Sequence, residues 1–379
     1  MKMVELFAGA GGLGLGLEKC GFEPALVVEW DKWCCDTLKE NKASDSDGWN
    51  IEMADVRDVN FSDLTDVSLV SGGPPCQPFS LGGRHKAVSD KRDMFPEAVR
   101  AVRELQPKAF VFENVKGLTR RSFQNYFQYI QLQLEHPELT AKDEEDWSCH
   151  LRRLEQHHLS KSRVDLHYRT VTRVLNAADY GVPQSRERVF IVGFRDDMDV
   201  DWSFPAATHS KDSLAWDQNI SNDYWEKHNL KAEDGYVDQR LEARASKLDE
   251  RPSELAWNTI RDATKDLPDP RLHNGGFDDH VHQPGARAYK GHTGSPIDLP
   301  SKTLKAGVHG VPGGENMVVF PDGSMRYLTV RESARVQTFP DSHRFKGSWS
   351  ESMRQLGNAV PVDLAEAVGR GVARELYFA

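Results

Sequence analysis

Short apolar runs recur along the first half of the chain, and each gives way to glycine, proline or polar residues. The runs predict strands at Val4–Ala8, Ala25–Val28, Val67–Val70, Ala109–Val115, His167–Val171 and Val189–Phe194. Between two of them, apolar residues recur at helical spacing from Phe95 to Gln106, which predicts a crossover helix. Strands that alternate with helices favour an α/β domain with a mostly parallel sheet and helices on both faces.

The second half of the chain has a different pattern. From Ser210 to Glu254 it is charged, dotted with tryptophan and weakly periodic, and from Arg271 to Val311 it is rich in Gly, Pro, His and Thr. Hydrogen-bonding side chains on such a loop-built surface are suited to reading base edges in a groove. Helical patterns return at Thr329, an N-cap of a helix that Pro340 stops, and at Asp363–Tyr377, a terminal helix able to pack on the first domain.

We therefore expect two domains with a boundary near Trp202. The first is a catalytic and cofactor-binding domain of residues 1–203, completed by residues 353–379, and the second is a smaller loop-rich domain of residues 204–352. A polar helical insert at about 118–162 is expected to lie outside the core sheet.

Composition and charge narrow the class of protein. The chain has 379 residues, a formal net charge of −10 and no run of about 18 apolar residues, so we expect no membrane span. The negative charge argues against a generic polyanion binder but leaves room for a local basic cleft. The amino terminus lacks a signal-peptide pattern, and the five cysteines form no C-x-x-C pair, so we expect thiols in the cytoplasm.

A glycine-rich loop follows the first predicted strand. Gly9, Gly11 and Gly14 match the dinucleotide fingerprint, and Glu29 lies about 20 residues beyond, as a ribose-binding acid should. The loop predicts a nucleotide-like cofactor, although a purely structural glycine turn stays an alternative. Trp30 is a candidate for stacking on a purine, or else a core tryptophan, and Asp55 could accept from an adenine amine.

Cys76 stands between prolines at the end of the third predicted strand. Pro74 and Pro75 fix φ there, and open α/β sheets place their chemistry at such carboxyl ends. The position suits a nucleophile, and a structural turn with an incidental thiol is the alternative. The basic stretch 81–92 that follows is a candidate mobile lid whose cations contact phosphates, or else a solvated loop.

Two further segments carry candidate chemistry. Glu113 ends an apolar strand, where desolvation raises a carboxyl pKa and suits a proton donor; anchoring a loop is the alternative. Arg186 and Arg188 are two residues apart at a strand start and should point to the same side. One could hold a planar oxygen acceptor and the other a phosphate, or both could form a salt-bridged sheet edge.

Histidines and cysteines do not predict a metal. The spacing of Cys149, His150, His157 and His158 fits no usual zinc pattern, and the histidines between 273 and 309 lie in irregular loop sequence. We expect no metal site.

In this order, the motifs resemble the cytosine-5 DNA methyltransferase family. The resemblance covers Glu5 to about Phe194 and Leu328 to the end, and leaves the middle as the family's variable target recognition region. Glu5 stands where the family often has Asp, and the insert at 118–162 is longer than a minimal member needs. The motifs are Leu6-Phe7-Ala8-Gly9-x-Gly11-Gly12, Glu29-Trp30, Asp55, Gly73-Pro74-Pro75-Cys76-Gln77, Glu113-Asn114-Val115, Gln184-x-Arg186-x-Arg188, Arg331-Glu332-x-Ala334-Arg335-x-Gln337-x-Phe339-Pro340 and Gln355-Leu356-Gly357-Asn358-Ala359-Val360-Pro361.

This resemblance implies a Rossmann-like methyltransferase that modifies carbon 5 of a cytosine within a specific DNA sequence, after base flipping and transient addition of Cys76. It implies S-adenosylmethionine as cofactor, with S-adenosylhomocysteine as product. Cys76, Glu113 and Arg188 take the catalytic roles. The cofactor residues are Phe7, Ala8, Gly9, Gly11, Gly12, Glu29, Trp30, Asp55, Val56, Pro75, Asn358 and Ala359. The DNA contacts are Gln77, Ser80, Arg84, Gln184, Arg186 and Thr303.

The implied setting is a prokaryotic restriction-modification system, with a monomer acting on nucleoid DNA beside a partner endonuclease. A methyltransferase for cytosine in transfer RNA is the alternative, which the long region from Pro205 to Ser324 argues against. A non-catalytic DNA-binding relative is a second alternative, which the intact Cys76, Glu113 and Arg188 argue against.

Overall fold

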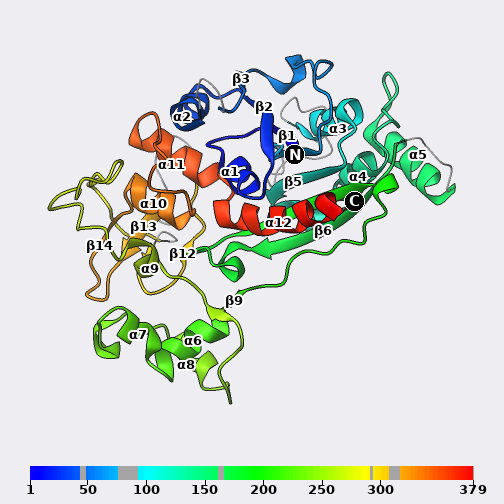
Figure 1. Cartoon of the computed structure of the whole chain (residues 1–379). Coiled ribbons are helices and arrows are strands. Elements are labelled where there is room, and N and C mark those ends of the chain that lie inside the picture. The colour runs from blue at the N-terminus through cyan, green and yellow to red at the C-terminus, as the bar shows by residue number, and fades with distance from the viewer. Residues whose placement is uncertain (43–47, 76–92, 161–165, 291–292, 307–315, 379) are drawn as a thin grey trace.

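The computed structural model describes residues 1–42, 48–75, 93–160, 166–290, 293–306 and 316–378 (Figure 1). Its main sheet has seven strands in the order β3-β2-β1-β4-β5-β8-β6 within the described ranges. Strands β1 to β5 all run parallel to one another, and β8 is antiparallel to both of its neighbours, β5 and β6. The strands are β1 (Lys2–Leu6), β2 (Glu23–Glu29), β3 (Ile51–Met53), β4 (Leu69–Gly72), β5 (Ala109–Val115), β6 (Tyr168–Asn176) and β8 (Glu187–Arg195).

Helices cover both faces of this sheet, as the alternation of β5 requires. Phe110 and Phe112 point to one buried cluster with α3 (Phe95–Leu105), while Ala109 and Val111 point to the other. That second cluster holds α1 (Gly12–Glu18) and α12 (Val362–Phe378), which lie side by side across the sheet in Figure 1. The predicted α/β architecture and the return of the terminal helix onto the first domain are confirmed.

One helix of the predicted insert shares a buried cluster with the core sheet. Tyr126, Tyr129 and Ile130 on α4 (Gln124–Glu135) belong to the same buried cluster as Phe110 and Phe112 of β5. The apolar face of α4 packs against the sheet, and α5 (Trp147–Ser160) packs against α4. Helix α4 therefore lies outside the strands of the sheet and forms part of the core that covers them.

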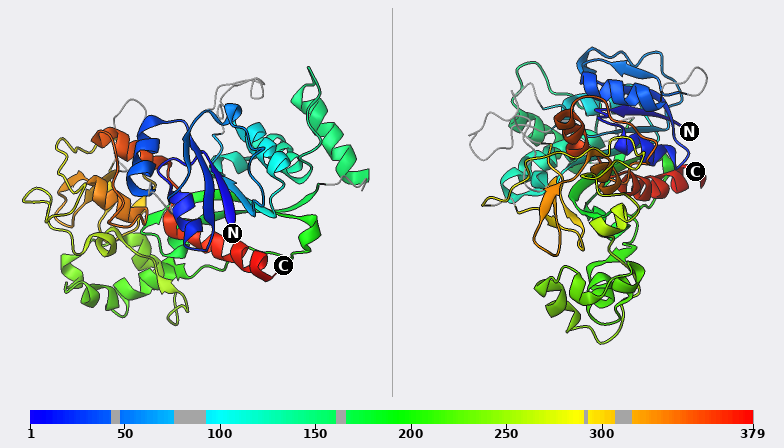
Figure 2. Two further views of the ribbon diagram at one scale, coloured as in Figure 1. Left: turned by 45° about the horizontal axis from the view of Figure 1, so that its top comes forward. Right: turned by 90° about the vertical axis from the view of Figure 1, so that its left-hand side faces the viewer.

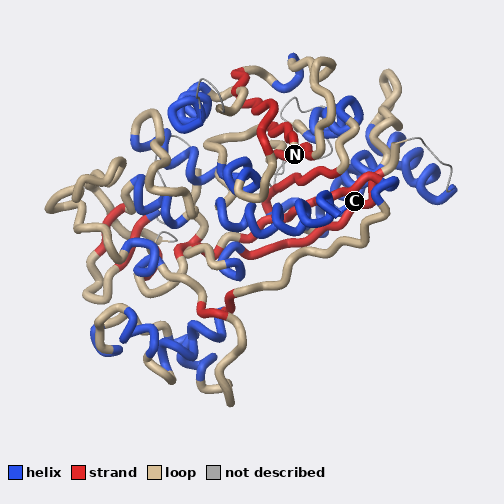
Figure 3. The backbone as a smooth tube through the Cα atoms, in the orientation of Figure 1, coloured by secondary structure: helices blue, strands red, loops and turns tan. Residues whose placement is uncertain are grey.

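Beyond β8 the chain forms a group of short helices with a core of its own, built on Leu214, Tyr224, Trp225 and Leu241. In Figure 2 this group extends away from the sheet, and Figure 3 shows the long connection that leads to it. Its elements are α6 (Lys211–Asn219), α7 (Asp223–Lys227) and α8 (Gln239–Ala245), with β9 (His209–Ser210) paired to β10 (Leu255–Ala256).

A second part of this region lies against the sheet domain. Strand β12 pairs with β7, the short strand that precedes β8, and β11, β13 and β14 form a small sheet. Strand β7 is Gln184–Ser185. The elements of this part of the second region are α9 (Ile260–Thr264), β11 (Ser295–Pro296), β12 (Ser301–Lys302), β13 (Met317–Val319) and β14 (Met325–Tyr327).

Helix α10 (Val330–Val336) joins the two regions. Thr329 and Glu332 form a capping box at its start, as the N-cap pattern predicted. Its Ala334 packs with Ala8 of the glycine loop, whereas Val336 packs with Leu328 of the second region. Residues 330–352, grouped by sequence with the second domain, therefore also pack on the first.

The remaining elements are short or peripheral. Helix α2 (Lys32–Lys42) follows β2, and α11 (Trp349–Asn358) ends just before Pro361, which separates it from α12. One-turn 3₁₀ helices occur at η1 (Val56–Asp58), η3 (Lys116–Thr119), η4 (Arg121–Phe123), η5 (Ala177–Tyr180), η6 (Asp196–Met198) and η7 (Ala232–Asp234). Over the ranges described, no helix has the length and apolar character to cross a membrane.

Candidate active site

The glycine loop connects β1 to α1 in an unusual backbone conformation. Phe7, Gly9 and Gly11 have φ of 57°, 58° and 86°, in the left-handed region that favours glycine. A Cβ on Gly9 would meet nothing within 4 Å, so the loop leaves open space at this point. A Cβ on Gly12 would lie 2.2 Å from the Val360 carbonyl oxygen, so the loop touches the turn that carries Asn358 and Ala359.

Glu29 is held rigidly at the end of β2. Its carboxylate accepts from the backbone N–H groups of Gly9 (2.7 Å), Trp30 (2.9 Å) and Asp31 (2.8 Å). Burial raises the pKa of Glu29, and these hydrogen bonds oppose that rise. Trp30 is 75% exposed, which excludes the core-tryptophan alternative.

The next acid along the sheet edge is Asp55, after β3. It caps η1 by accepting from the Arg57 N–H at 3.0 Å, and its carboxylate also pairs with the Arg57 guanidinium. That pairing lowers the pKa of Asp55. The carboxylate of Asp55 therefore keeps its negative charge at neutral pH. Val56 beside it is buried.

Glu113 and Arg188 form an ion pair at the same edge of the sheet. Arg188 Nε lies 2.9 Å from Glu113 Oε1, and the two side chains are only 12% and 10% exposed. Arg188 sits opposite Val115 in the β5–β8 ladder, two positions from Glu113, so both side chains project from one face. Burial raises the pKa of Glu113 despite the attraction of Arg188.

The loop before Cys76 is tied to this pair. Asn114 Nδ2 donates to the Pro74 carbonyl oxygen at 2.8 Å, and a Cβ on Gly73 would lie 3.5 Å from Glu113 Oε2. The Met94 N–H donates to the Pro75 carbonyl oxygen at 3.0 Å, which brings together the two ends of segment 76–92. Cys76, Gln77, Ser80 and Arg84 lie in that segment, outside the described residues.

Arg186 and Gln184 are fully buried, which contradicts the expected contacts with DNA. Arg186 donates to the carbonyl oxygens of Leu304 (3.2 Å) and Gly357 (2.8 Å), and Gln184 Oε1 accepts from the Leu304 N–H at 3.1 Å. Both side chains hold the second region and α11 against the sheet domain. The half-buried Thr303 donates to the Ser185 carbonyl oxygen at 2.9 Å at the same junction.

Glu5, which stands where the family often has Asp, supports the glycine loop. This buried acid of β1 accepts from the Gly14 N–H at 3.0 Å, and desolvation raises its pKa to about 8. A Cβ on Gly14 would lie 2.0 Å from Glu5 Oε2, so the acid supports the start of α1 at close contact. An acidic residue inside the apolar run Val4–Leu6 was the signal available in the sequence.

Comparisons with known proteins agree with this geometry. The family model described as C-5 cytosine-specific DNA methylase matches residues 1–138 and 151–374. Type II methyltransferase M.NgoMIV of Neisseria gonorrhoeae is 30% identical over 98% of this chain and 97% of its own length. Type II methyltransferase M.PspPI of a Psychrobacter species is 34% identical over 99% of this chain and 79% of its own.

Solved structures share the fold over the whole chain. A prophage-encoded protein of E. coli has a TM-score of 0.60 at 21% identity and covers 100% of this chain and 99% of its own. The S. pombe Dnmt2 methyltransferase has a TM-score of 0.57 at 16% identity, with coverage of 100% and 98%. With the family model matching nearly the entire sequence, the chain belongs to the C-5 cytosine-specific DNA methylase family.

Proposed function

We propose that this DNA cytosine-5 methyltransferase acts through Cys76, Glu113 and Arg188 at one edge of its sheet. The observation that carries the proposal is the buried Glu113–Arg188 pair, which lies against Gly73, three residues before Cys76. Family membership supplies the reaction, and the pair supplies a proton donor and a cation beside the loop that leads to the thiol.

Each of these residue types has a task in the reaction. Carbon 5 of cytosine is a weak nucleophile until a thiolate adds to carbon 6, and we assign that addition to Cys76. Glu113 holds ring nitrogen 3 and the exocyclic amine, and its raised pKa favours the protonated form that can donate to the ring. Arg188 holds the carbonyl oxygen of the base, where its charge offsets the charge that develops on addition. Once carbon 5 carries the methyl group, loss of its proton to water re-forms the C5–C6 double bond and expels the Cys76 thiolate.

The residues at the carboxyl ends of β1 to β3 fit the S-adenosylmethionine expected for this family. The open space at Gly9 allows close approach to the backbone, the ordered Glu29 carboxylate suits ribose hydroxyls, and exposed Trp30 suits stacking on the adenine. When bound, this group supplies an electrophilic methyl on a sulfonium. Asp55 lies next along the sheet edge as acceptor for the adenine amine. The other residues proposed to line the site are Phe7, Ala8, Gly11, Gly12, Val56, Pro75, Asn358 and Ala359.

The DNA substrate must present its cytosine outside the helix, because carbon 6 is inaccessible in a stacked duplex. We propose that residues 204–352 hold the duplex as a target recognition domain, and that Gln77, Ser80, Arg84 and Thr303 contact it near the flipped base. The relatives named Type II methyltransferases favour a role in protecting host DNA within a restriction-modification system. We further propose that the chain acts as a monomer on nucleoid DNA, beside a partner endonuclease.

Labelled cofactor tests this proposal directly. Wild-type protein and Cys76→Ser are incubated with unmethylated plasmid DNA or with transfer RNA, and label in each nucleic acid is counted. We expect label in DNA with the wild type and none with Cys76→Ser, which should still bind DNA. Label in transfer RNA alone would contradict the assignment of DNA as the substrate. Full activity of Cys76→Ser would contradict the assignment of Cys76 as the nucleophile.

A further inference from the structure

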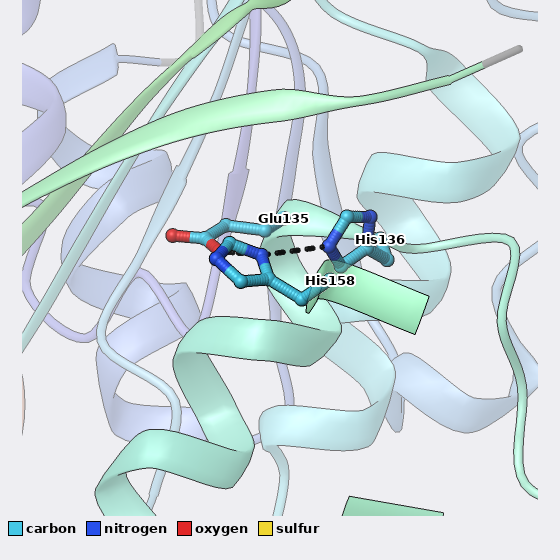
Figure 4. Close-up of side chains that lie close together, drawn as sticks. All are labelled: Glu135, His136 and His158. Carbon is cyan, nitrogen blue, oxygen red and sulfur yellow. Dashed lines mark hydrogen bonds and ion pairs between the residues drawn. The ribbon is translucent and has the colours of Figure 1, made fainter. Parts of the chain in front are cut away.

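A cluster of histidines lies where α4, α5 and β6 meet. His136 caps the carboxyl end of α4 and His158 is in the last turn of α5, while the His136 ring lies 4.9 Å from His167 and 5.0 Å from His157, between centroids. Figure 4 shows Glu135, His136 and His158 turned toward one another. One donor atom from each of these three lies within 4.8 Å of the other two.

The contacts converge on a single atom, Nδ1 of His158. It lies 3.2 Å from His136 Nε2 and 3.5 Å from Glu135 Oε2. A neutral imidazole carries one proton on two nitrogens and a carboxylate carries none. The three atoms that face one another can therefore share at most one proton from each ring, and with those protons on the other ring nitrogens each atom would offer a lone pair to a cation at the centre.

The surroundings orient these groups. Thr170 on β6 donates to Glu135 Oε1 at 2.6 Å, which leaves Oε2 directed at His158. His136 is buried, with only 5% of its surface exposed. The His158 side chain is 50% exposed and opens the cluster to solvent.

The cluster is separate from the active site. It lies at the start of β6, where Tyr168 is opposite Arg195, whereas Arg188 of the Glu113 pair is opposite Leu175, near the other end of β6. Of the four residues considered together from sequence, His157 and His158 belong to this cluster, whereas His150 and Cys149 have other partners. His150 bonds Tyr129 Oη and the Leu139 carbonyl oxygen, and Cys149 is exposed beside Arg152.

We propose that Glu135, His136 and His158 bind one Zn²⁺ ion and leave a fourth coordination position open. Two imidazoles and a carboxylate are a ligand set of zinc, and imidazole nitrogen disfavours Mg²⁺ and Ca²⁺. The ion joins the ends of α4 and α5 next to β6, so its effect is on stability and not on methyl transfer.

Calorimetric titration of the untagged, metal-stripped full chain with ZnCl2 tests the site. We expect one ion per chain, a weakening of at least about tenfold in His158→Ala and in Glu135→Gln, and no change in the exposed control His273→Ala. Zinc should raise the melting temperature of the wild type and of the control, but much less that of the two site variants. Co²⁺ should give the visible absorption of a tetrahedral centre in the wild type and in the His273→Ala control, but not in the two site variants.

His158 is half-exposed, so its replacement should not prevent folding. The melting temperatures of both site variants without zinc check that each is folded. Absence of saturable zinc binding by the wild type would overturn the proposal. Equal affinity in the wild type and both site variants, or equal weakening in His273→Ala, would also overturn it.

Discussion

The residue with the strongest chemical signal is Glu113, a carboxylic acid at the end of an apolar strand. Its position predicted burial and a raised pKa, and the structure has both, with Arg188 at 2.9 Å. Replacement by Gln keeps the shape and a hydrogen-bond acceptor for Arg188 but removes the proton that Glu113 would donate.

We expect Glu113→Gln to slow methyl transfer by about 10² to 10⁴-fold, the usual contribution of a positioned acid, with DNA and cofactor binding retained. Single-turnover rates and filter binding measure the two effects. Glu187→Gln is the matched control, because Glu187, on the neighbouring strand β8, forms an exposed pair with Lys116. A rate for Glu113→Gln close to that of Glu187→Gln would argue against the catalytic assignment.

Glu5 should make stability depend on pH. Its folded pKa of about 8 lies above its ordinary value of 4.5, so the folded protein keeps a proton that the unfolded chain releases. The stabilisation is complete below pH 4.5 and is lost as pH rises to 8, with a slope of up to about 1.4 kcal/mol per pH unit.

Glu5→Gln keeps the acceptor for Gly14 and removes the titration. Urea unfolding at several pH values should therefore give a flatter stability curve for Glu5→Gln than for the wild type between pH 5 and 8. Identical slopes for the two proteins would mean that Glu5 does not titrate in this range.

Local sequence could identify Glu113 and Glu29, because each follows an apolar run in its own strand. It could not identify the partners of Arg186, since Leu304 and Gly357 are more than a hundred residues away along the chain. The histidine cluster was missed for a similar reason, because His136 and His158 come from different helices and meet only in the folded chain. Cys76 stays a prediction, because it lies outside the described residues.

At the scale of elements, the contact between α1 and α12 fixes the terminal helix on the sheet domain. A Cβ on Gly16 would lie 2.5 Å from both Ala365 Cβ and the Val362 carbonyl oxygen. Only a glycine permits this approach, since a backbone carbonyl cannot move aside without shifting α12.

We expect Gly16→Ala to lower the free energy of unfolding by about 1 to 3 kcal/mol, because overpacking outweighs the higher helix propensity of alanine, about 1 kcal/mol. Gly117→Ala is the control, as a Cβ there would meet only Val115 Cγ2 at 3.9 Å. Chemical denaturation measures both variants. An unchanged or increased stability for Gly16→Ala would contradict the close packing of the two helices.

Strands β1, β2, β4, β5 and β8 were well predicted, because buried strands appear as continuous apolar runs. Strand β3 was not predicted, because it has only three residues and is largely exposed. The short elements of the second region were not predicted either, because β9 to β12 have only two residues each and show no periodicity.

At the scale of the whole molecule, Arg186 holds the two regions together from a fully buried position. Arg186→Met should lower the free energy of unfolding by more than about 2 kcal/mol, because two buried carbonyl groups lose their donors. A residue that contacts a phosphate would behave differently. Its loss would leave stability unchanged and reduce the salt dependence of DNA binding by about one unit of slope.

Arg173→Met, at an exposed position of β6, is the matched control for Arg186→Met. Denaturation curves and DNA affinity at several salt concentrations separate the two roles. If Arg186→Met had wild-type stability and a weaker salt dependence of DNA binding, Arg186 would contact DNA after all, against the inference from its buried position.

The central claim is that Cys76 adds to carbon 6 of a cytosine in DNA, and covalent trapping tests it most directly. A long duplex with 5-fluorocytosine throughout removes the need to know the recognised sequence, and fluorine cannot leave as the proton does. With cofactor present, we predict a protein–DNA adduct whose mass-mapped attachment is Cys76, and no adduct with Cys76→Ser. Attachment at another residue, or no adduct from protein that methylates ordinary DNA, would contradict the account.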